Sequence, residues 1–154
     1  MSAAEAALSS KWEGVQSVAL QVLGGWGGKN AIDIIRGFLD DAFAREHGWA
    51  IRNVAVKELA KLVGSDDVDW VLNLYFWRPG VLEKHELLPV VLSLPPAKAK
   101  AGLVRELASS DPTIRQAAVK AIGNMPFKDR KALLTPLHKD ENTEVRASAR
   151  ALTP

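Results

Sequence analysis

The chain of 154 residues contains no cysteine. This absence excludes a disulfide framework, a cysteine-ligated zinc site and a cysteine nucleophile. Long apolar runs are also missing. The longest one, residues 87–94, is interrupted by Pro89 and is far shorter than the roughly 20 residues that a membrane-spanning helix needs. Residues 1–5 contain neither a basic nor an apolar segment, so we expect no signal peptide, no membrane contact and a cytoplasmic protein.

An excess of one charge is missing as well, since 20 lysines and arginines stand against 18 aspartates and glutamates. The two signs are unevenly spread along the chain. Residues 1–77 carry seven basic and ten acidic side chains, whereas residues 78–154 carry thirteen and eight. A uniform polyanion would be attracted by one half and repelled by the other. A protein partner of mixed charge therefore fits this distribution better than a nucleic acid does.

A short pattern recurs along the chain. Four segments align without gaps, and each has a β-branched residue and an alanine four positions later. A large aliphatic residue follows four positions further in the first three segments and three positions further, at Leu152, in the fourth. This spacing places the three residues on one face of a helix. The second and third segments are 63 residues apart, about twice the 31 that separate the third and fourth, so a degenerate repeat is expected near residue 82. The four segments begin at Val15, Ile51, Ile114 and Val145.

A helical period of 30 to 40 residues is typical of α-solenoids. Residues 111–123 and 142–152 resemble HEAT repeats, particularly the short type first noticed in phycobilin lyases. The resemblance is close over residues 103–152, looser over 12–76 and poor over 79–102. It implies an all-α fold, a right-handed α-solenoid of about four HEAT-like helix pairs plus a terminal helix, in a single domain of residues 1–154.

Glycines, prolines and capping residues suggest where each helix begins and ends. The glycine-rich residues 24–28 predict one break with Asn30 as the next cap, and Gly64 and Ser65 predict another. Asp111 is expected to cap a later helix, while Pro89 and Pro136 are expected to kink theirs. The predicted pairs are 11–23 with 30–44, 48–63 with 66–77, 80–93 with 96–108, and 112–124 with 128–139, followed by a half repeat at 142–152.

The second helices of HEAT-like pairs usually line the concave face. Here the first two of these helices are acidic, and the last two, residues 96–108 and 128–139, are basic. We therefore predict a noncatalytic protein–protein interaction scaffold that binds an acidic segment of a partner on its concave face. An ordinary solvated helix surface is the alternative explanation of the same charges. The predicted binding residues are Trp70, Trp77, Lys98, Lys100, Arg105, Lys128, Arg130 and Lys131.

All five tryptophans lie in the first half of the chain. Trp12 and Trp49 precede the repeat motif at similar places, which favours a packing role for both. Trp26 lies among glycines and is the tryptophan expected to be exposed. Trp70 and Trp77 share one helical face, which suits either a core or an interface hot spot. The arginine that follows the β-branched residue in three repeats, at positions 52, 115 and 146, is expected to contact acidic residues or turn carbonyls of the adjacent repeat.

Other repeat proteins suggest alternative functions. Some alkylpurine DNA glycosylases are built from HEAT-like repeats, and Trp70, Trp77, Asp69 and Arg105 resemble their tryptophan, aspartate and arginine set, although the acidic helix 66–77 would repel phosphates. A DNA-binding protein without catalysis belongs to the same alternative. A phycobilin-lyase-like role has no visible bilin pocket in the sequence.

Metal chemistry has little support. HEAT-repeat deoxyhypusine hydroxylases bind a diiron centre through several His-Glu pairs, whereas this chain has one, His85-Glu86, besides His47 and His138. We therefore expect no enzyme activity, no cofactor and no metal. The partnerless last helix leaves a monomer or an end-to-end homodimer as the two expected states.

Overall fold

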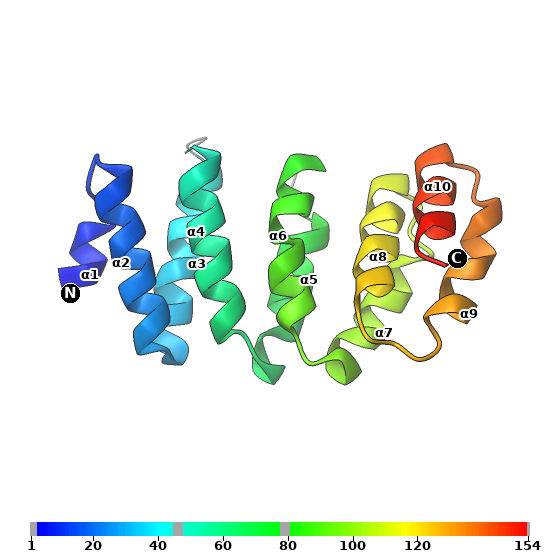
Figure 1. The fold of residues 1–154 in the computed structure, drawn as a ribbon, viewed down its shortest axis with the longest axis horizontal. Coiled ribbons are helices and arrows are strands. Elements are labelled where there is room, and N and C mark those ends of the chain that lie inside the picture. Colours follow the sequence, from blue (N-terminus) through cyan, green and yellow to red (C-terminus); the bar gives the residue numbers. More distant parts are fainter. Residues whose placement is uncertain (1–2, 45–47, 78–80, 154) are drawn as a thin grey trace. The chain divides into compact units, whose positions relative to one another are not determined.

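A computed structural model describes residues 3–44, 48–77 and 81–153 of the chain (Figure 1). Within these ranges every regular element is a helix, so the predicted all-α class is confirmed. Neighbouring helices pack against each other in a repeat-like manner. The contacts divide the chain into two compact units, Met1–Val63 and Gly64–Pro154.

The first unit is organised around helix α4. Helices α2 and α3 both pack on α4 and on each other, and the short α1 packs on α2. The core consists of aliphatic side chains from all three long helices, including Leu20, Ile35 and Leu59. The helices are α1 (Ala3–Ala7), α2 (Glu13–Trp26), α3 (Gly28–Ala44) and α4 (Trp49–Leu62).

The second unit is organised around helix α8. This helix packs on α6, α7 and α10, while α5 packs on α6 and α7. Its core includes Tyr75, Leu103 and Ile122. The elements are the 3₁₀ turn η1 (Ser65–Asp67), α5 (Val68–Trp77), α6 (Val81–Ser93), α7 (Pro96–Glu106), α8 (Pro112–Asn124), α9 (Arg130–Leu134), the 3₁₀ segment η2 (Thr135–Lys139) and α10 (Thr143–Ala151).

The alanine of the repeated motif is buried in all four segments, and its large aliphatic residue is buried in the first three. The pairs are Ala19 with Leu23, Ala55 with Leu59, Ala118 with Ile122, and Ala149 with Leu152, of which only Leu152 keeps partial exposure. The β-branched position is buried at Ile51, Ile114 and Val145 but exposed at Val15. The first segment therefore departs from the others at this one position.

Several predicted helix ends are wrong around the glycines. Helix α2 continues past Gly24 to Trp26 and ends at Gly27, and α3 begins directly at Gly28. The φ angles of Gly27 and Gly28, 71° and 80°, favour glycine. Gly24 lies inside the helix, where the Glu58 side chain of α4 occupies the space that a Cβ would need. Asn30 consequently lies inside α3 and caps nothing.

The second predicted cap is also wrong. Ser65 lies inside η1, and the turn is closed instead by the Asp67 carboxylate, which accepts a hydrogen bond of 2.8 Å from the Gly64 N–H group. The cap at Asp111 is confirmed, because its carboxylate accepts the Thr113 N–H group at 2.7 Å. The Thr113 hydroxyl group also donates to this carboxylate, at 2.7 Å, and the hydrogen bonds from the Thr113 side chain and backbone lower the pKa of Asp111.

Proline shapes the predicted helix 128–139 more strongly than expected. The segment is not one kinked α-helix, because α9 ends at Leu134 and the chain continues as the 3₁₀ segment η2. Pro136 lacks the N–H group that an α-helix would use at this point, which explains the change. Pro89 lies inside α6 as predicted.

Two of the three recurring arginines, Arg115 and Arg146, form the predicted structural contacts. Arg115 is buried, and its guanidinium group donates to both carboxylate oxygens of Asp140, at 2.9 and 2.8 Å. It also donates to the carbonyl oxygens of Ser109 and Ser110. Arg146 donates to the carbonyl oxygens of residues 140 and 141 at 2.6 and 2.9 Å. Arg115 and Arg146 thus fix the turns before α8 and α10.

Two tryptophans do not pack as expected. Trp12 is 66% exposed and Trp49 is 64% exposed. Trp12 is the residue just before α2, and Trp49 is the first residue of α4, so each indole lies at a helix end and not on a packed face. The Lys11 ammonium group lies 5.6 Å from the centre of the Trp12 ring. Trp26 is exposed, as predicted.

The cap of α10 offers a first test of this local structure. The Asn142 side-chain oxygen accepts the N–H groups of Glu144 and Val145 at 2.9 and 3.2 Å. We expect Asn142→Ala to lower the free energy of unfolding by about 1 kcal/mol, because these N–H groups lose their acceptor. Urea unfolding followed by circular dichroism measures this. Asn142→Asp keeps the acceptor, so an equal loss in both variants would contradict the capping role.

Candidate binding groove between α5 and α7

A groove of about 570 Å³ lies between α5 and α7 in the second unit. It includes three of the residues that the sequence predicts for binding, namely Trp77, Lys98 and Arg105. The remaining lining residues are Val68, Asp69, Leu72, Asn73 and Phe76 from α5, with Ala101 and Gly102 from α7. The structure thus brings together residues from the second helices of two consecutive predicted pairs, 66–77 and 96–108.

The close approach of the two helices depends on Gly102. A Cβ atom at this position would lie 2.5 Å from Cδ1 of Leu72, so even alanine would force Leu72 to move. Leu72 and Phe76 are buried, whereas Trp77 is 61% exposed. The groove therefore has an apolar floor and an indole accessible to a ligand.

The charged side chains of the groove are two bases and one acid, Lys98, Arg105 and Asp69. Arg105 is anchored at one edge, because its Nε atom donates to Oε1 of Glu106 at 2.9 Å. The Glu106 carboxylate is buried, while the Arg105 side chain is 74% exposed. This ion pair fixes the arginine at the surface and leaves its terminal nitrogens available to a bound carboxylate.

Trp70 differs from Trp77. It lies on α5, is half-buried and is not among the residues that line the groove. The predicted pair of indoles thus contributes one indole to this site. Phe76, Asn73 and Gly102, which sequence reasoning did not select, contribute to it as well.

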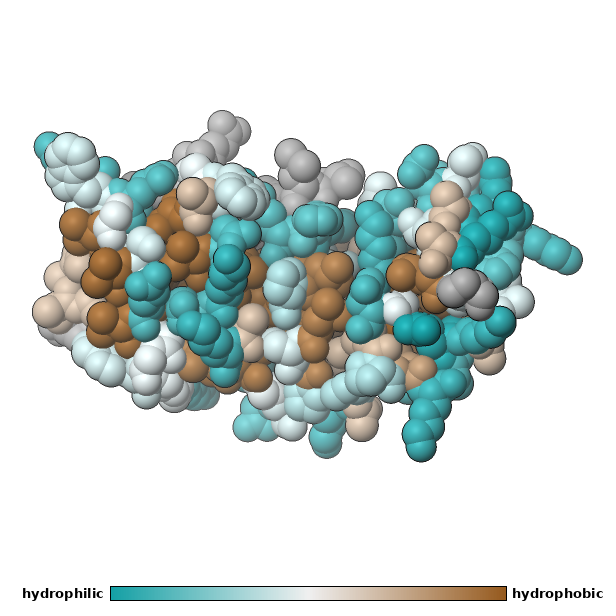
Figure 2. All heavy atoms as spheres, in the orientation of Figure 1, coloured by the Kyte–Doolittle hydropathy of each residue, from teal (hydrophilic) through white to brown (hydrophobic). Residues whose placement is uncertain are grey.

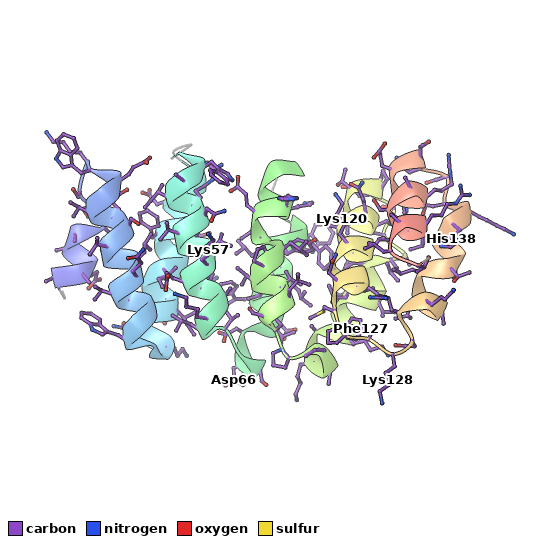
Figure 3. All side chains as sticks on the ribbon, in the orientation of Figure 1. Lys57, Asp66, Lys120, Phe127, Lys128 and His138 are labelled. Atoms are coloured by element: carbon purple, nitrogen blue, oxygen red, sulfur yellow. The ribbon has the colours of Figure 1, made fainter. Side chains whose placement is uncertain are left out.

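The other predicted basic residues lie around the turn that connects α8 to α9. Lys100 of α7 pairs with Asp129 at 2.7 Å, lies 5.8 Å from the centre of the Phe127 ring and lowers the pKa of that aspartate. Arg130 donates to the carbonyl oxygen of Gly123 at 2.9 Å and so holds the turn. Lys128 and Lys131 are exposed, and Lys128 points away from the helices in Figure 3.

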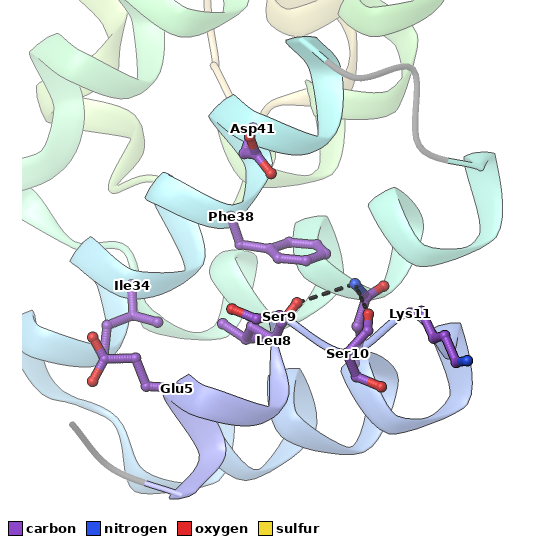
Figure 4. Close-up of a pocket in the computed structure, with 9 residues that line it drawn as sticks. Glu5, Leu8, Ser9, Ser10, Lys11, Ile34, Phe38 and Asp41 are labelled. Carbon is purple, nitrogen blue, oxygen red and sulfur yellow. Dashed lines mark hydrogen bonds between the residues drawn. The ribbon is translucent and has the colours of Figure 1, made fainter.

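A second hollow, of about 550 Å³, lies in the first unit between the α1–α2 connection and α3 (Figure 4). Its buried polar residue, Gln16, donates from Nε2 to the carbonyl oxygens of Leu8 and Ser10, at 3.0 and 2.8 Å. Gln16 therefore holds the connection in place. Its amide group is engaged in the fold, so this hollow is a weaker candidate than the groove.

The two histidines that the structure describes have separate surroundings. His85 on α6 is exposed, and Nε2 of His138 lies 2.7 Å from the Thr153 hydroxyl group. His47 lies outside the described residues. In the part of the chain that the structure describes, no group of three histidine, aspartate or glutamate residues could hold a metal ion.

No protein-family model matches the chain, and no curated protein matches it either. Among the helices within the described ranges, none is both long and apolar enough to cross a membrane.

Proposed function

We propose that the chain is a noncatalytic interaction scaffold whose α5–α7 groove binds an acidic segment of a partner protein. In this proposal residues 1–154 form one HEAT-like domain, a right-handed α-solenoid of about four helix pairs plus a terminal helix, and the lack of cysteine suits the cytoplasm. The observation that carries the proposal is the exposed Trp77 indole beside Lys98 and Arg105, above an apolar floor.

Each part of the groove has a role in this proposal. Tryptophan and arginine are the residues most enriched in interface hot spots, because they bury a large area and still direct polar contacts. Trp77 would cover an apolar side chain of the partner, while Lys98 and Arg105 would pair with neighbouring carboxylates. Asp69 lies in the same groove and would repel a strand with a negative charge at every step. This arrangement favours a segment in which acidic and apolar residues alternate.

A longer acidic segment would extend toward the α8–α9 turn. The Lys100–Asp129 ion pair joins α7 to this turn, so the exposed Lys128 and Lys131 side chains lie on the element next to the groove. Arg130 and Lys100 would then act mainly as supports, because both already hold protein groups. Trp70 would support Trp77 from within α5.

The proposal predicts which substitutions weaken peptide binding. A fluorescent peptide of alternating glutamate and leucine should bind the wild type and bind less tightly as salt rises. Trp77→Ala should raise its Kd about 30-fold, which corresponds to roughly 2 kcal/mol. Lys98→Glu with Arg105→Glu should abolish binding. Fluorescence anisotropy at low and physiological salt measures all of these.

The matched control is the pair Lys128→Glu and Lys131→Glu, which changes the same total charge outside the groove. A short peptide should lose little affinity in this control, whereas a peptide twice as long should lose more. If the control weakens the short peptide as much as the groove variants do, net charge alone governs binding and the groove has no special role.

A specific observation keeps one enzyme class as a second candidate. Three of the four residues that resemble the alkylpurine DNA glycosylase set, Asp69, Trp77 and Arg105, line the same groove, and the fourth, Trp70, does not. Against it stand Asp66 and Asp67, which precede α5 and would repel a phosphate backbone. Release of methylated purine bases from alkylated DNA, abolished by Asp69→Asn, would establish the enzyme. If no methylated base is released even at high protein concentration, the enzyme is excluded and the interaction scaffold is the remaining proposal.

A further inference from the structure

One face of the first unit is apolar and exposed. It comprises Val15, Val18, Val22 and Trp26 on α2, whose spacing of three and four residues places them on one side of the helix. Val18 is 60% exposed and Trp26 is 63% exposed. Figure 2 shows apolar residues gathered over α1 and α2. We call this surface the α2 face.

The α2 face is also uncharged and slightly hollow. A concavity of about 480 Å³ lies over it, and among the described residues none of those that line it carries a charge. The lining adds only small residues to the four named above: Ala3, Ala4, Ala7, Gly14 and Ala19. An exposed apolar surface of this kind typically marks a contact with another molecule. A charged partner segment would lose its hydration here without gaining a counter-charge.

The large and small residues on this side of α2 are placed so that two antiparallel copies of the helix can fit together. Gly14 and Gly25 belong to the same side of the helix as the valines, and nothing lies within 4 Å of a Cβ placed at either position. If two copies of α2 lie antiparallel and centred on residue 20, Val18 faces Val22 of the other copy. Trp26 then faces Gly14, and Val15 faces Gly25. Trp26 and Val15 of each copy thus lie over a glycine of the other copy.

We propose that the α2 face binds the α2 face of a second copy of this chain, forming a symmetric antiparallel dimer. Such a contact uses the same surface on both partners and closes on itself. The Trp26 indole of each copy would cover Gly14 of the other. None of the residues that line the α5–α7 groove belongs to the α2 face, so this proposal does not rest on the proposed scaffold function.

The charges of α10 argue against a head-to-tail alternative. The exposed residues of α10 include Glu144 and Arg150. Placing α10 on the α2 face would desolvate these two charges against an uncharged surface. Pairing two α2 faces desolvates no charge that lines the concavity. Charge matching therefore selects the second copy's α2 face.

The size of the surface sets the expected strength of the dimer. A stable interface buries roughly 800 Å² on each partner. Four large side chains with a few small neighbours supply less than this, so we expect a weak dimer that forms as the protein concentration rises. Sedimentation equilibrium across the micromolar to millimolar range should show the average mass rising from 16.7 kDa toward twice this value.

Two variants test the pairing from different sides. Val18→Glu places a charge at the centre of the contact and should keep the chain monomeric throughout the range. Gly14→Leu fills the gap that receives Trp26 and should weaken the dimer at least tenfold. Both positions face open solvent in the monomer, so circular dichroism should show unchanged helix content.

Ala147→Glu on α10 is the control, because this exposed residue lies outside the α2 face and the dimer should be unaffected. Loss of association in this variant, or growth beyond a dimer, would show a head-to-tail contact and overturn the proposal. A wild type that stays monomeric would overturn it as well, including the case in which it binds uncharged lipid vesicles instead. An unchanged dimer in Gly14→Leu would refute the antiparallel register.

Discussion

Replacing Arg115 with alanine is expected to lower the free energy of unfolding by about 3–5 kcal/mol. The Arg115 and Asp140 side chains are both almost fully buried, with 7% and 6% of their surfaces exposed. Their two parallel hydrogen bonds are the strong bidentate type. Without the guanidinium group, the buried Asp140 carboxylate loses its ion-pair partner, and the Ser109 and Ser110 carbonyl groups lose a donor.

Urea unfolding of the purified variant measures this loss. Arg150→Ala is the matched control, because this exposed arginine on α10 donates one hydrogen bond, to the carbonyl oxygen of His138 at 3.0 Å. The control should change stability by less than about 1 kcal/mol. Similar losses in both variants would mean that the burial of the Arg115–Asp140 pair adds nothing to the free energy of unfolding.

The same pair predicts how stability depends on pH. The hydrogen bonds from Arg115 hold the pKa of Asp140 below its ordinary value. A carboxyl group with a lowered pKa in the folded state stabilises the protein above its unfolded pKa, which is about 4. This contribution is lost as the pH falls through the folded pKa. The wild type should therefore lose more stability on acidification than Arg115→Ala does, which urea titrations at pH 7 and pH 3 would show.

The repeat explains why this arginine could be predicted from the sequence while its partner could not. Arg115 follows the β-branched residue that faces the core, so its side chain must lie near the preceding turn. The Ser109 and Ser110 carbonyl groups are part of that turn. Asp140 is 25 positions away, and its approach depends on how η2 returns toward α8. No pattern within one repeat contains that information.

Burial at the β-branched position shows another limit of the sequence. Val15 aligns with Ile51, Ile114 and Val145 but is 45% exposed, whereas the other three are buried. Helix α2 has only the five-residue α1 on this side, whereas α8 has α6, α7 and α10 around it. The motif predicts which side of the helix is apolar. It cannot predict whether another helix covers that side.

The groove was predictable in part for a related reason. Trp77, Lys98 and Arg105 could be selected from residue type alone, as a tryptophan on the predicted helix 66–77 and two bases on the predicted helix 96–108. The contribution of Gly102 could not, since its effect depends on the register between α5 and α7, which places Leu72 where its Cβ would be. The packing role predicted for Trp12 and Trp49 was wrong because of where the helices begin. Helix α2 begins one residue after Trp12, and α4 begins at Trp49 itself, so both indoles lie at helix ends.

Replacing Tyr75 with alanine is expected to cost about 3–5 kcal/mol, because it removes a large side chain from the core of the second unit. Tyr75 on α5 is fully buried, and its ring packs edge-on against Phe76 at 5.0 Å between centres. Its hydroxyl group donates to the carbonyl oxygen of Ala117 on α8 at 3.0 Å. This one residue therefore both fills the core and joins two helices.

Tyr75→Phe separates the two contributions. It keeps the ring and removes only the hydroxyl group, and it should cost about 0.5–1.5 kcal/mol, the usual net contribution of one hydrogen bond. Urea unfolding of both variants gives the comparison. If phenylalanine costs as much as alanine, the hydrogen bond to α8 matters more than the packing of the ring, contrary to this expectation.

Tyr75 is the only tyrosine in the chain, so its ionisation can be followed by ultraviolet absorbance without interference from another phenol. Burial raises the pKa of Tyr75 far above its ordinary value, because the phenolate would be desolvated. A group with a raised pKa in the folded state stabilises the protein below its unfolded pKa of about 10, and this contribution is lost at higher pH. The phenolate signal should therefore appear together with unfolding and not before it. A phenolate signal near pH 10 in a chain that still shows full helix content would place the hydroxyl group in water and contradict its contact with Ala117.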